Sequence, residues 1–456
     1  MEFRTEHDML GEKNIPLKAY WGIHTQRALE NFPLYSGVVS LPLMKAMAMV
    51  KKACALANKD LGYLTPEKAS VVISVCDEIM AGKLNDQFPL DALQGGAGTS
   101  TNMNLNEVIA NRGLEIMGRA RGDYAALHPL EDANLHQSTN DVYPTALKVA
   151  LILGVRSLSE TTALLQGAFQ RKEKEFAGII KLGRTEMQDA VPITLGAEFS
   201  GMAEAVSRDR WRTFKCEERL RVVNIGGTAV GTGLGAPRDY IFLVIEKLRE
   251  VTGLGVCRAE NMMGDTAHAD TFVEVSGILK AHAVNILKIS NDLRLMNMLG
   301  EIVLPSVQAG SSIMPGKVNP VILEAVSQAG LKVIAQDGLV TQAASRGTGQ
   351  IIEFMPLLAD ALLGAVDLLV KADGMLTAHI DGIKADEDRC RHYVDRSRTL
   401  ITAFVPVVGY DRCQALLKEF DDIKEDNLRA FLNRRLGVEI VNKTLAPHNL
   451  VGLGHR

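Results

Sequence analysis

Five long apolar segments constrain what this chain can fold into. They show helical periodicity and cover roughly residues 141–174, 194–223, 270–298, 321–344 and 351–380. In the first segment, seven apolar residues come almost consecutively: Leu147, Val149, Ala150, Leu151, Ile152, Leu153 and Val155. A helix that is apolar on every face must be buried on all sides. The sequence therefore predicts an all-α fold with a thick central bundle of long helices, which also buries surface against other copies of the chain.

The composition agrees with a soluble helical protein. The 456 residues are 47% hydrophobic and 23% charged, enough for two or three domains around a large core. Only 5% are aromatic, which favours helices over sheets. The net charge of -4 and the lack of long Lys/Arg runs argue against a nucleic-acid partner.

Neither a membrane partner nor a signal peptide is expected. Residues 1–6 lack the apolar stretch of a signal peptide, and the most apolar stretch, 146–155, contains Lys148 and is too short to cross a bilayer. The six cysteines have no paired spacing, which indicates free thiols and a reducing cytoplasmic location. The ten histidines show neither HxH nor HExxH spacing, so no metal site is predicted.

The chain divides into three expected regions. Residues 1–137 form an N-terminal domain with a hairpin-like lead, and residues 138–385 form the central bundle. Residues 386–456, rich in Arg, Lys and Asp, form a small C-terminal helical domain. Shorter helices are expected over residues 41–61, 66–81, 105–112, 410–420 and 425–436.

The segment between the third and fourth long helices concentrates polar chemistry. It reads Gly310-Ser311-Ser312-Ile313-Met314-Pro315-Gly316-Lys317-Val318-Asn319-Pro320. A flexible loop that leads into a helix N-terminus binds anions well, because unpaired amide groups and the helix dipole point at the ligand. Lys317 adds a charge and Asn319 a neutral donor. An ordinary linker is the alternative, but linkers rarely carry such groups between two long apolar helices.

Three further polar clusters interrupt the apolar chain. They contain Thr99 in a glycine-rich loop, the run Ser138-Thr139-Asn140-Asp141, and Thr185-Glu186. Each could be structural alone: Ser100 or Thr101 could cap one helix and Ser138 or Thr139 the next, with Asp141 in the first turn. Four such clusters in one apolar bundle favour a shared site.

These motifs resemble the fumarase/aspartase superfamily. The resemblance covers most of residues 3–385 and rests on the 310–320 loop, the Arg-Thr-Glu-His-Asp-Met-Leu-Gly opening at 4–11, Tyr20-Trp21-Gly22-Ile23-His24-Thr25, and the glycine-rich run 226–233. It implies an all-α homotetramer with a shared helix bundle, in which three chains build each active site. It also implies reversible addition of water or ammonia across the dicarboxylate fumarate, without an organic cofactor.

The resemblance assigns a base and a carboxylate clamp. Ser311 would remove the C3 proton, and Thr99, Ser138, Thr139 and Ser312 would hold the adjacent carboxylate. Preplaced hydroxyl donors stabilise the charge that develops there, each by about 3 kcal/mol in a dry site. The glycines around Ser311 are typical of a lid that closes during turnover.

The remaining site residues face the other end of the substrate. Lys317 and Asn319 would hold the second carboxylate, and Asn140, Thr185 and Glu186 would face the leaving group. Family fumarases carry histidine at the position of Glu186. An ionised glutamate is repelled by a dicarboxylate unless a cation lies between them, and an ammonium group supplies that cation. Glu186 therefore favours an amine-bearing substrate and aspartase-type activity.

Several alternatives stay open on sequence alone. Glu186 could pair with Arg184 and not meet substrate. The activity could be fumarate hydration, or addition of another amine to fumarate, and a bundle protein without turnover is a third class. The segment after Met296 is also several residues shorter than the family usually has before Glu301-Ile302-Val303-Leu304-Pro305.

Overall fold

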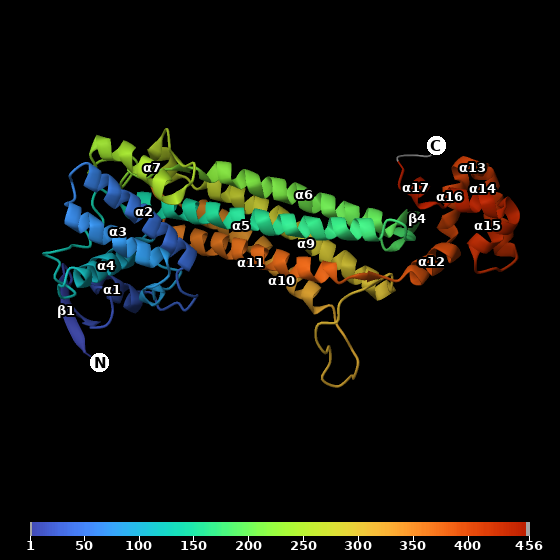
Figure 1. The fold of residues 1–456 in the computed structure, drawn as a ribbon, viewed down its shortest axis with the longest axis horizontal. Coiled ribbons are helices and arrows are strands. Elements are labelled where there is room, and N and C mark those ends of the chain that lie inside the picture. Colours follow the sequence, from blue (N-terminus) through green and yellow to red (C-terminus); the bar gives the residue numbers. More distant parts are fainter. Residues whose placement is uncertain (1, 453–456) are drawn as a thin grey trace. The chain divides into compact units, whose positions relative to one another are not determined.

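A computed structural model describes residues 2–452. It confirms the all-α prediction: helices dominate, and the strands of the described residues form only two-stranded sheets (Figure 1). The helices are α1 (Ile23–Asn31), α2 (Leu41–Asp60), α3 (Pro66–Met80), α4 (Thr99–Ile116), α5 (Thr139–Glu175), α6 (Leu195–Leu220), α7 (Arg238–Thr252), α8 (Met262–Ala267), α9 (Asp270–Leu299), α10 (Val321–Ala344), α11 (Met355–Asp381), α12 (Glu387–Arg396), α13 (Val405–Val408), α14 (Tyr410–Asp422), α15 (Leu428–Leu436), α16 (Val438–Thr444) and α17 (Pro447–Leu450), with 3-10 helices η1 (Asn85–Gln87) and η2 (Arg398–Phe404).

The strands form four small sheets. Three are antiparallel, β1 with β2, β3 with β4 and β7 with β8, and β5 with β6 is parallel. The strands are β1 (Phe3–Asp8), β2 (Gly11–Pro16), β3 (Ile180–Thr185), β4 (Gln188–Thr194), β5 (Val222–Val223), β6 (Cys257–Arg258), β7 (Ile302–Val303) and β8 (Lys384–Ala385). The first pair confirms the predicted N-terminal hairpin.

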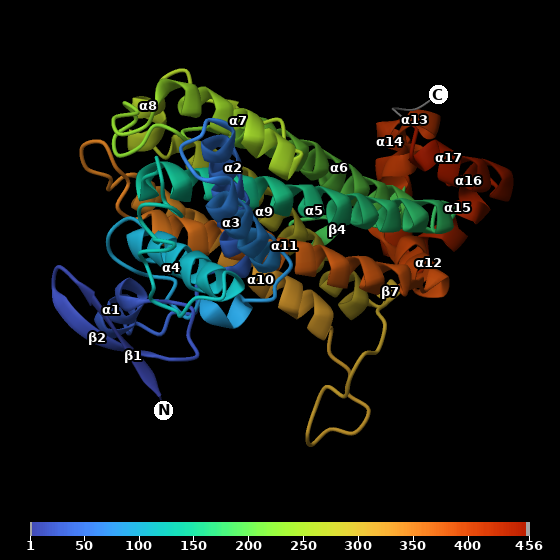
Figure 2. The ribbon, with the colours of Figure 1, turned by 60° about the vertical axis from the view of Figure 1, so that its left-hand side comes forward.

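The five predicted long helices are α5, α6, α9, α10 and α11, and their stretches lie side by side (Figures 1 and 2). Most bounds match the apolar pattern within three residues. One predicted bound is wrong: α11 begins only at Met355, four residues later than expected. The largest difference within that limit is at the end of α6, which stops at Leu220 because Val222–Val223 pair as a strand with β6. The prediction for α4 is also wrong, because this helix begins at Thr99 and not near Leu105.

The contacts within the chain define two compact units. One comprises residues 1–158, 212–280 and 332–368, and the other residues 159–211, 281–331 and 369–456. Each of the five long helices contributes residues to both units. The three-region division by sequence remains a prediction.

The apolar run of α5 is buried as expected. Val149, Leu151 and Ile152 are fully buried, whereas Leu153 is 40% exposed. One chain therefore covers most of this run by itself. By length and composition α5 is the one helix of the described residues that could cross a membrane, but 72% of its apolar window is buried inside the fold. This burial is typical of a core helix.

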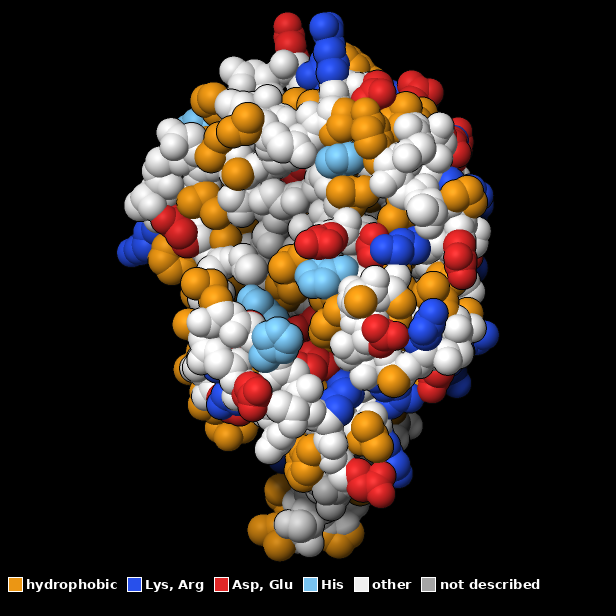
Figure 3. Space-filling model, turned by 90° about the vertical axis from the view of Figure 1, so that its left-hand side faces the viewer, with side chains coloured by type: hydrophobic (Ala, Val, Ile, Leu, Met, Phe, Trp, Pro, Cys, Tyr) orange, Lys and Arg blue, Asp and Glu red, His pale blue; other side chains and the backbone are white. Residues whose placement is uncertain are grey.

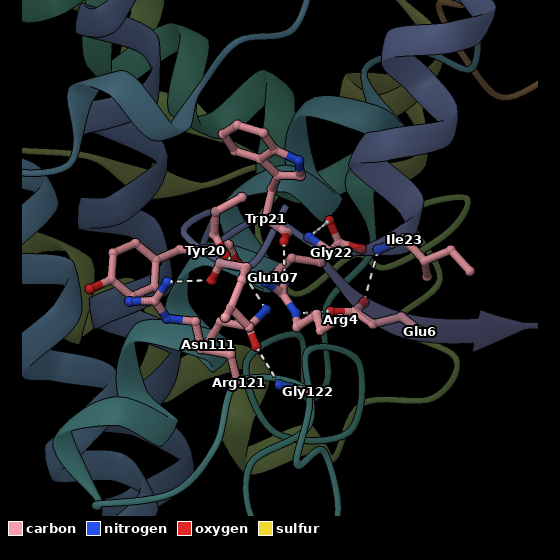
Figure 4. A network of polar contacts seen from close by, with 12 residues as sticks. Arg4, Glu6, Tyr20, Trp21, Gly22, Ile23, Glu107, Asn111, Arg121 and Gly122 are labelled. Atoms are coloured by element: carbon pink, nitrogen blue, oxygen red, sulfur yellow. Dashed lines mark hydrogen bonds and ion pairs between the residues drawn. The ribbon is translucent and has the colours of Figure 1, made fainter. Parts of the chain in front are cut away.

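The start of α1 is held by two carboxylates from distant elements (Figure 4). Gly22 precedes the helix without a side-chain cap. Glu107 of α4 accepts hydrogen bonds from the amides of Gly22 at 2.9 Å and His24 at 2.8 Å, and Glu6 of β1 accepts from Ile23 at 2.9 Å. Burial raises the pKa of Glu107 to about 7. A Cβ at position 22 would lie 2.6 Å from the Glu6 carboxylate, so only glycine fits there.

The second unit contains a buried histidine between two aspartates. His282 of α9 lies 3.0 Å from the Asp209 carboxylate through Nδ1 and 2.9 Å from that of Asp373 through Nε2. Thr162 donates to Asp373 at 2.7 Å, and Asn285 donates to Asp209 at 2.8 Å. Burial lowers the pKa of His282, but the two carboxylates outweigh it and raise the pKa to about 10. The imidazole is therefore charged and links α5, α6, α9 and α11.

Helices α12 to α17 enclose a separate hydrophobic core. It includes Phe404, Leu416 and Phe431, all fully buried. Leu182 of β3 lies in the same core, and Ile180 packs against it. The β3–β4 hairpin is therefore anchored by residues more than 200 positions later in the chain.

The face drawn in Figure 3 carries acidic, basic and apolar side chains interspersed. The coloured side chains of this face form no basic stripe of the kind that nucleic-acid binding needs.

Candidate active site

Thr99 is the first residue of α4. The residue before it, Gly98, has a left-handed backbone conformation that favours glycine. Gly98 precedes the helix with φ 91°. A Cβ there would lie 2.3 Å from the buried ring of Tyr143 in α5, so a side chain is excluded by space as well as by backbone angle. The predicted cap at Ser100 or Thr101 is wrong, because the cap position is Gly98. Thr99 is partly exposed and donates its hydroxyl to the Gly96 carbonyl at 2.8 Å.

Ser138 and Asp141 together close the start of α5. The Ser138 hydroxyl accepts from the Asn140 amide at 3.2 Å, and the Asp141 carboxylate accepts from the Ser138 amide at 2.9 Å. This reciprocal arrangement satisfies amides that the helix itself leaves unpaired. It confirms Ser138 as a cap and Asp141 as a first-turn residue.

Asp141 also holds the glycine-rich 226–233 segment against the same turn. Its second carboxylate oxygen accepts from the Gly226 amide at 3.1 Å and from the Thr228 amide at 3.0 Å. The side chain is fully buried, and this burial raises the pKa of Asp141 to about 6. Asn140 donates to the Ala229 carbonyl at 2.7 Å, which fixes Asn140 against the same segment.

A buried amide network joins the starts of α4 and α5. The Asn134 carbonyl oxygen accepts from Asn102 at 3.2 Å, Asn106 at 3.1 Å and Lys51 at 2.8 Å. Asn102 also donates to the Thr139 hydroxyl at 3.2 Å. Thr139 is thus connected through Asn102 and Asn134 to Lys51 of α2 by hydrogen bonds. Burial lowers the pKa of Lys51 to about 8.

Ser311 lies in an exposed loop whose two ends are hydrogen-bonded to each other. The Gly310 amide donates to the Lys317 carbonyl at 2.7 Å, and the Asn319 side chain donates to the Gly310 carbonyl at 2.9 Å. Gly310 leaves no room for a Cβ, which would lie 2.8 Å from the Lys317 carbonyl oxygen. The Ser311 hydroxyl accepts from the amides of Ile313 at 3.2 Å and Met314 at 2.9 Å. Two N–H groups therefore point at one hydroxyl oxygen.

Glu186 forms the tip of the β3–β4 hairpin with Met187. Their φ angles are 52° and 60°, so both lie in the left-handed region that suits asparagine and glycine in a two-residue turn. Each such residue costs about 1 kcal/mol or more. Among the described residues Glu186 has no ion pair, and Arg184 pairs with Glu301 at 2.6 Å instead. The alternative pairing of Glu186 with Arg184 is therefore not what the structure contains.

The predicted site residues fall into two groups. Thr99, Ser138, Thr139 and Asn140 surround the adjoining starts of α4 and α5 in the first unit. The second unit holds Thr185 and Glu186 at the hairpin tip, and Ser311, Ser312, Lys317 and Asn319 in the loop before α10. The hydrogen bonds of the described residues do not connect the hairpin tip to the loop.

Comparison with known proteins gives a consistent family. A family model described as Lyase matches residues 11–335. Aspartate ammonia-lyase of a Bacillus species is 44% identical over 424 residues, 92% of this chain and 91% of that protein. The Escherichia coli K12 aspartate ammonia-lyase is 44% identical over 89% of this chain and 87% of its own length. This chain belongs to the fumarase/aspartase superfamily.

Solved structures of superfamily members share the fold. A fumarate lyase:delta crystallin from Brucella melitensis, bound to cobalt, has a TM-score of 0.95 and 44% identity, and 99% of this chain and 100% of that one are covered. A class II fumarase from Schistosoma mansoni has a TM-score of 0.92 and 30% identity, with 99% of both chains covered. The superfamily resemblance read from the sequence is thus confirmed.

Sequence reasoning missed several buried polar residues that support the candidate site residues. Lys51 and Asn134 do not stand out in the sequence, and Glu301 does so only as part of a family motif, because each acts through partners remote in the chain. Lys51 and Asn134 are 83 positions apart. A charged residue inside an apolar helix pattern was the one available signal for Lys51. Asp141 was recognised as a first-turn residue, but its bonds to the 226–228 amides were not foreseen.

Proposed function

We propose that this protein is an aspartate ammonia-lyase, which converts L-aspartate into fumarate and ammonia. The observation that carries the proposal is 42% to 45% identity, over about nine tenths of the chain, to aspartate ammonia-lyases from several bacteria. The enzyme is a carbon–nitrogen lyase with a small dicarboxylate substrate. An organic cofactor is not required by this chemistry, because a positioned base and an anion cradle suffice.

Ser311 is the proposed base. Its oxygen, as an alkoxide, takes the C3 proton of aspartate and becomes a neutral hydroxyl. The two amides that point at this oxygen, from Ile313 and Met314, stabilise the alkoxide before the proton arrives. These amides are already oriented towards the oxygen, so the stabilisation needs no reorganisation of the loop around Ser311. The glycines at 310 and 316 allow the exposed loop to close over substrate.

The hydroxyl clamp is proposed to receive the charge released from C3. The electron pair of the broken C–H bond spreads onto the adjacent carboxylate, where Thr99, Ser138, Thr139 and Ser312 donate hydrogen bonds. The pair then forms the C2–C3 double bond, while the C2–N bond breaks and ammonia leaves with its electrons. Charge develops on this carboxylate during the step, so the clamp binds the transition state more tightly than the ground state.

Lys317 and Asn319 are proposed to hold the other carboxylate. Lys317 is exposed in the loop, and Asn319 already donates a hydrogen bond to the Gly310 carbonyl where the loop begins. Asn140, Thr185 and Glu186 face the amino group. Glu186, at the exposed hairpin tip and without an ion pair among the described residues, is suited to a substrate ammonium.

We infer that the enzyme is a cytoplasmic homotetramer with active sites shared between subunits. Large apolar side chains remain exposed on its long helices: Leu164 is 63% exposed, Leu331 56% and Val284 49%. Burial of such side chains against other copies is the ordinary fate of apolar helix faces. Analytical ultracentrifugation of the full chain tests the assembly.

The deciding experiment follows fumarate absorbance with purified protein, separately with L-aspartate and with L-malate. A rise with aspartate alone supports the ammonia-lyase. A rise with malate alone would replace it by a fumarate hydratase and refute the role of Glu186. Absence of a rise with either substrate would point to a different amine.

A further inference from the structure

Glu301 occupies a buried position between two elements of the second unit, strand β3 and the start of α12. Its side chain is fully buried and accepts from Arg184 at 2.6 Å and pairs with Lys181 at 2.9 Å, both on β3. Its backbone carbonyl accepts from the Asp386 amide at 2.9 Å, at the cap of α12. One residue thus fixes β3 and the beginning of the C-terminal helices at the same point.

Arg184 depends on this contact for its position. It is only 13% exposed, its other carboxylate partner is Asp189 at 3.6 Å, and its guanidinium lies 5.3 Å from the Tyr393 ring centre. Lys181, in contrast, has a second close partner in Glu198. Loss of the Glu301 charge would therefore affect Arg184 more than Lys181.

The strand on the other side of the turn is braced separately. Ser397 donates to the Asp189 carboxylate at 3.1 Å, and Thr399 donates to the Ala190 carbonyl at 2.6 Å. Both strands of the hairpin are thus held within two or three residues of its tip. Left-handed angles at two consecutive non-glycine residues cost energy and persist where the surroundings hold them, and these braces lie directly beside Glu186 and Met187.

We propose that Glu301 is a positioning residue for amine recognition. Through Arg184 it holds the strained turn so that Glu186 presents its carboxylate to the substrate ammonium. The inference rests on the proposed ammonia-lyase function. It does not place Glu301 in contact with substrate, and it concerns the amino end of the substrate and not its carboxylates.

The test compares a substrate that has the amino group with a dicarboxylate that lacks it. In Glu301→Gln, the KM for L-aspartate is expected to rise about tenfold or more, since small displacements of positioning groups have effects of this size. The inhibition constant of succinate, a four-carbon dicarboxylate without an amine, is expected to stay within about twofold. Equal changes in both constants, or an unchanged KM in a folded variant, would overturn the proposal.

Two further variants separate positioning from folding. Glu198→Gln removes a carboxylate from the same lysine but leaves the Glu301–Arg184 pair, so its KM for aspartate is expected to stay near that of the unchanged protein. The double change Glu301→Gln with Arg184→Gln leaves no uncompensated arginine. Its free energy of unfolding is expected to stay near that of the unchanged protein, while its KM for aspartate rises as in Glu301→Gln.

Hydrogen exchange makes the result independent of activity. In Glu301→Gln the amides of β3 and β4 are expected to exchange faster than in Glu198→Gln. If the unchanged protein releases no fumarate from aspartate, the proposed function fails. Equal exchange rates in the two variants would refute the role of Glu301 in holding the hairpin, whatever the activity.

Discussion

The Asp141 carboxylate lies 2.9 Å from the backbone nitrogen of Ser138 and accepts its hydrogen bond. The same carboxylate accepts from two amides of the 226–228 segment. Asp141 therefore fixes the backbone of Ser138, whose hydroxyl belongs to the proposed clamp, without being a clamp residue itself.

Asp141→Asn should lower both stability and turnover. An amide offers one acceptor oxygen in place of two and directs N–H groups at a neighbouring N–H donor, which costs about 1–3 kcal/mol. Urea denaturation measures the stability, and fumarate release measures kcat/KM. Asp60→Asn is the matched control, because Asp60 is 46% exposed and pairs with Lys247 at the surface; it should change stability by less than about 1 kcal/mol. Equal effects of the two changes would refute the role of Asp141.

Ser311→Ala should lower kcat by about 10²–10⁴-fold while the protein stays folded, because this is the usual loss when a general base is removed. The loop is exposed, so the change opens no core cavity. Steady-state fumarate absorbance and ultracentrifugation check activity and assembly. Ser306→Ala, an exposed serine five positions earlier, should retain activity. Turnover that survives in Ser311→Ala would eliminate Ser311 as the base.

Lys51→Met should remove a rise of stability with alkaline pH. The folded pKa of Lys51, about 8, lies below its ordinary value of 10.5 because of burial, so the unfolded chain binds more protons between these values. Stability contributed by this group therefore increases as pH goes from about 8 to 10.5, by at most about 3 kcal/mol. The urea midpoint of the unchanged protein should rise relative to that of the variant between about pH 7.5 and pH 9.5. A constant difference would contradict the prediction.

His282→Gln should give the opposite pH dependence. The folded pKa of His282, about 10, exceeds the ordinary 6.5 because Asp373 and Asp209 outweigh burial. Its contribution is then fully present below about pH 6.5 and disappears as pH rises towards 10. The variant should be less stable at pH 6.5, and the difference in urea midpoint should shrink by pH 9.5. A difference in urea midpoint that stays constant from about pH 6.5 to pH 9.5 would contradict the prediction.

The long helices were predictable because their apolar periodicity is a local property of the chain. The start of α4 was not, since Ser100, Thr101, Asn102 and Asn104 favour caps and turns in isolation. These polar residues are buried in the structure, and tertiary packing overrides their weak helix propensity. The candidate site residues followed from family motifs, whereas their supports, such as the ion pair of Glu301 with Arg184, depend on contacts between segments far apart in sequence.

The place of Leu182 has a consequence for how this chain could be cut or recombined. The small C-terminal helices resemble a detachable module in the sequence, yet their core contains Leu182 from the β3–β4 hairpin. A truncation after Ala385 would expose that leucine and remove the Ser397 and Thr399 braces together. In exchanges between relatives, residues 180–194 and the C-terminal helices should therefore be inherited as one block.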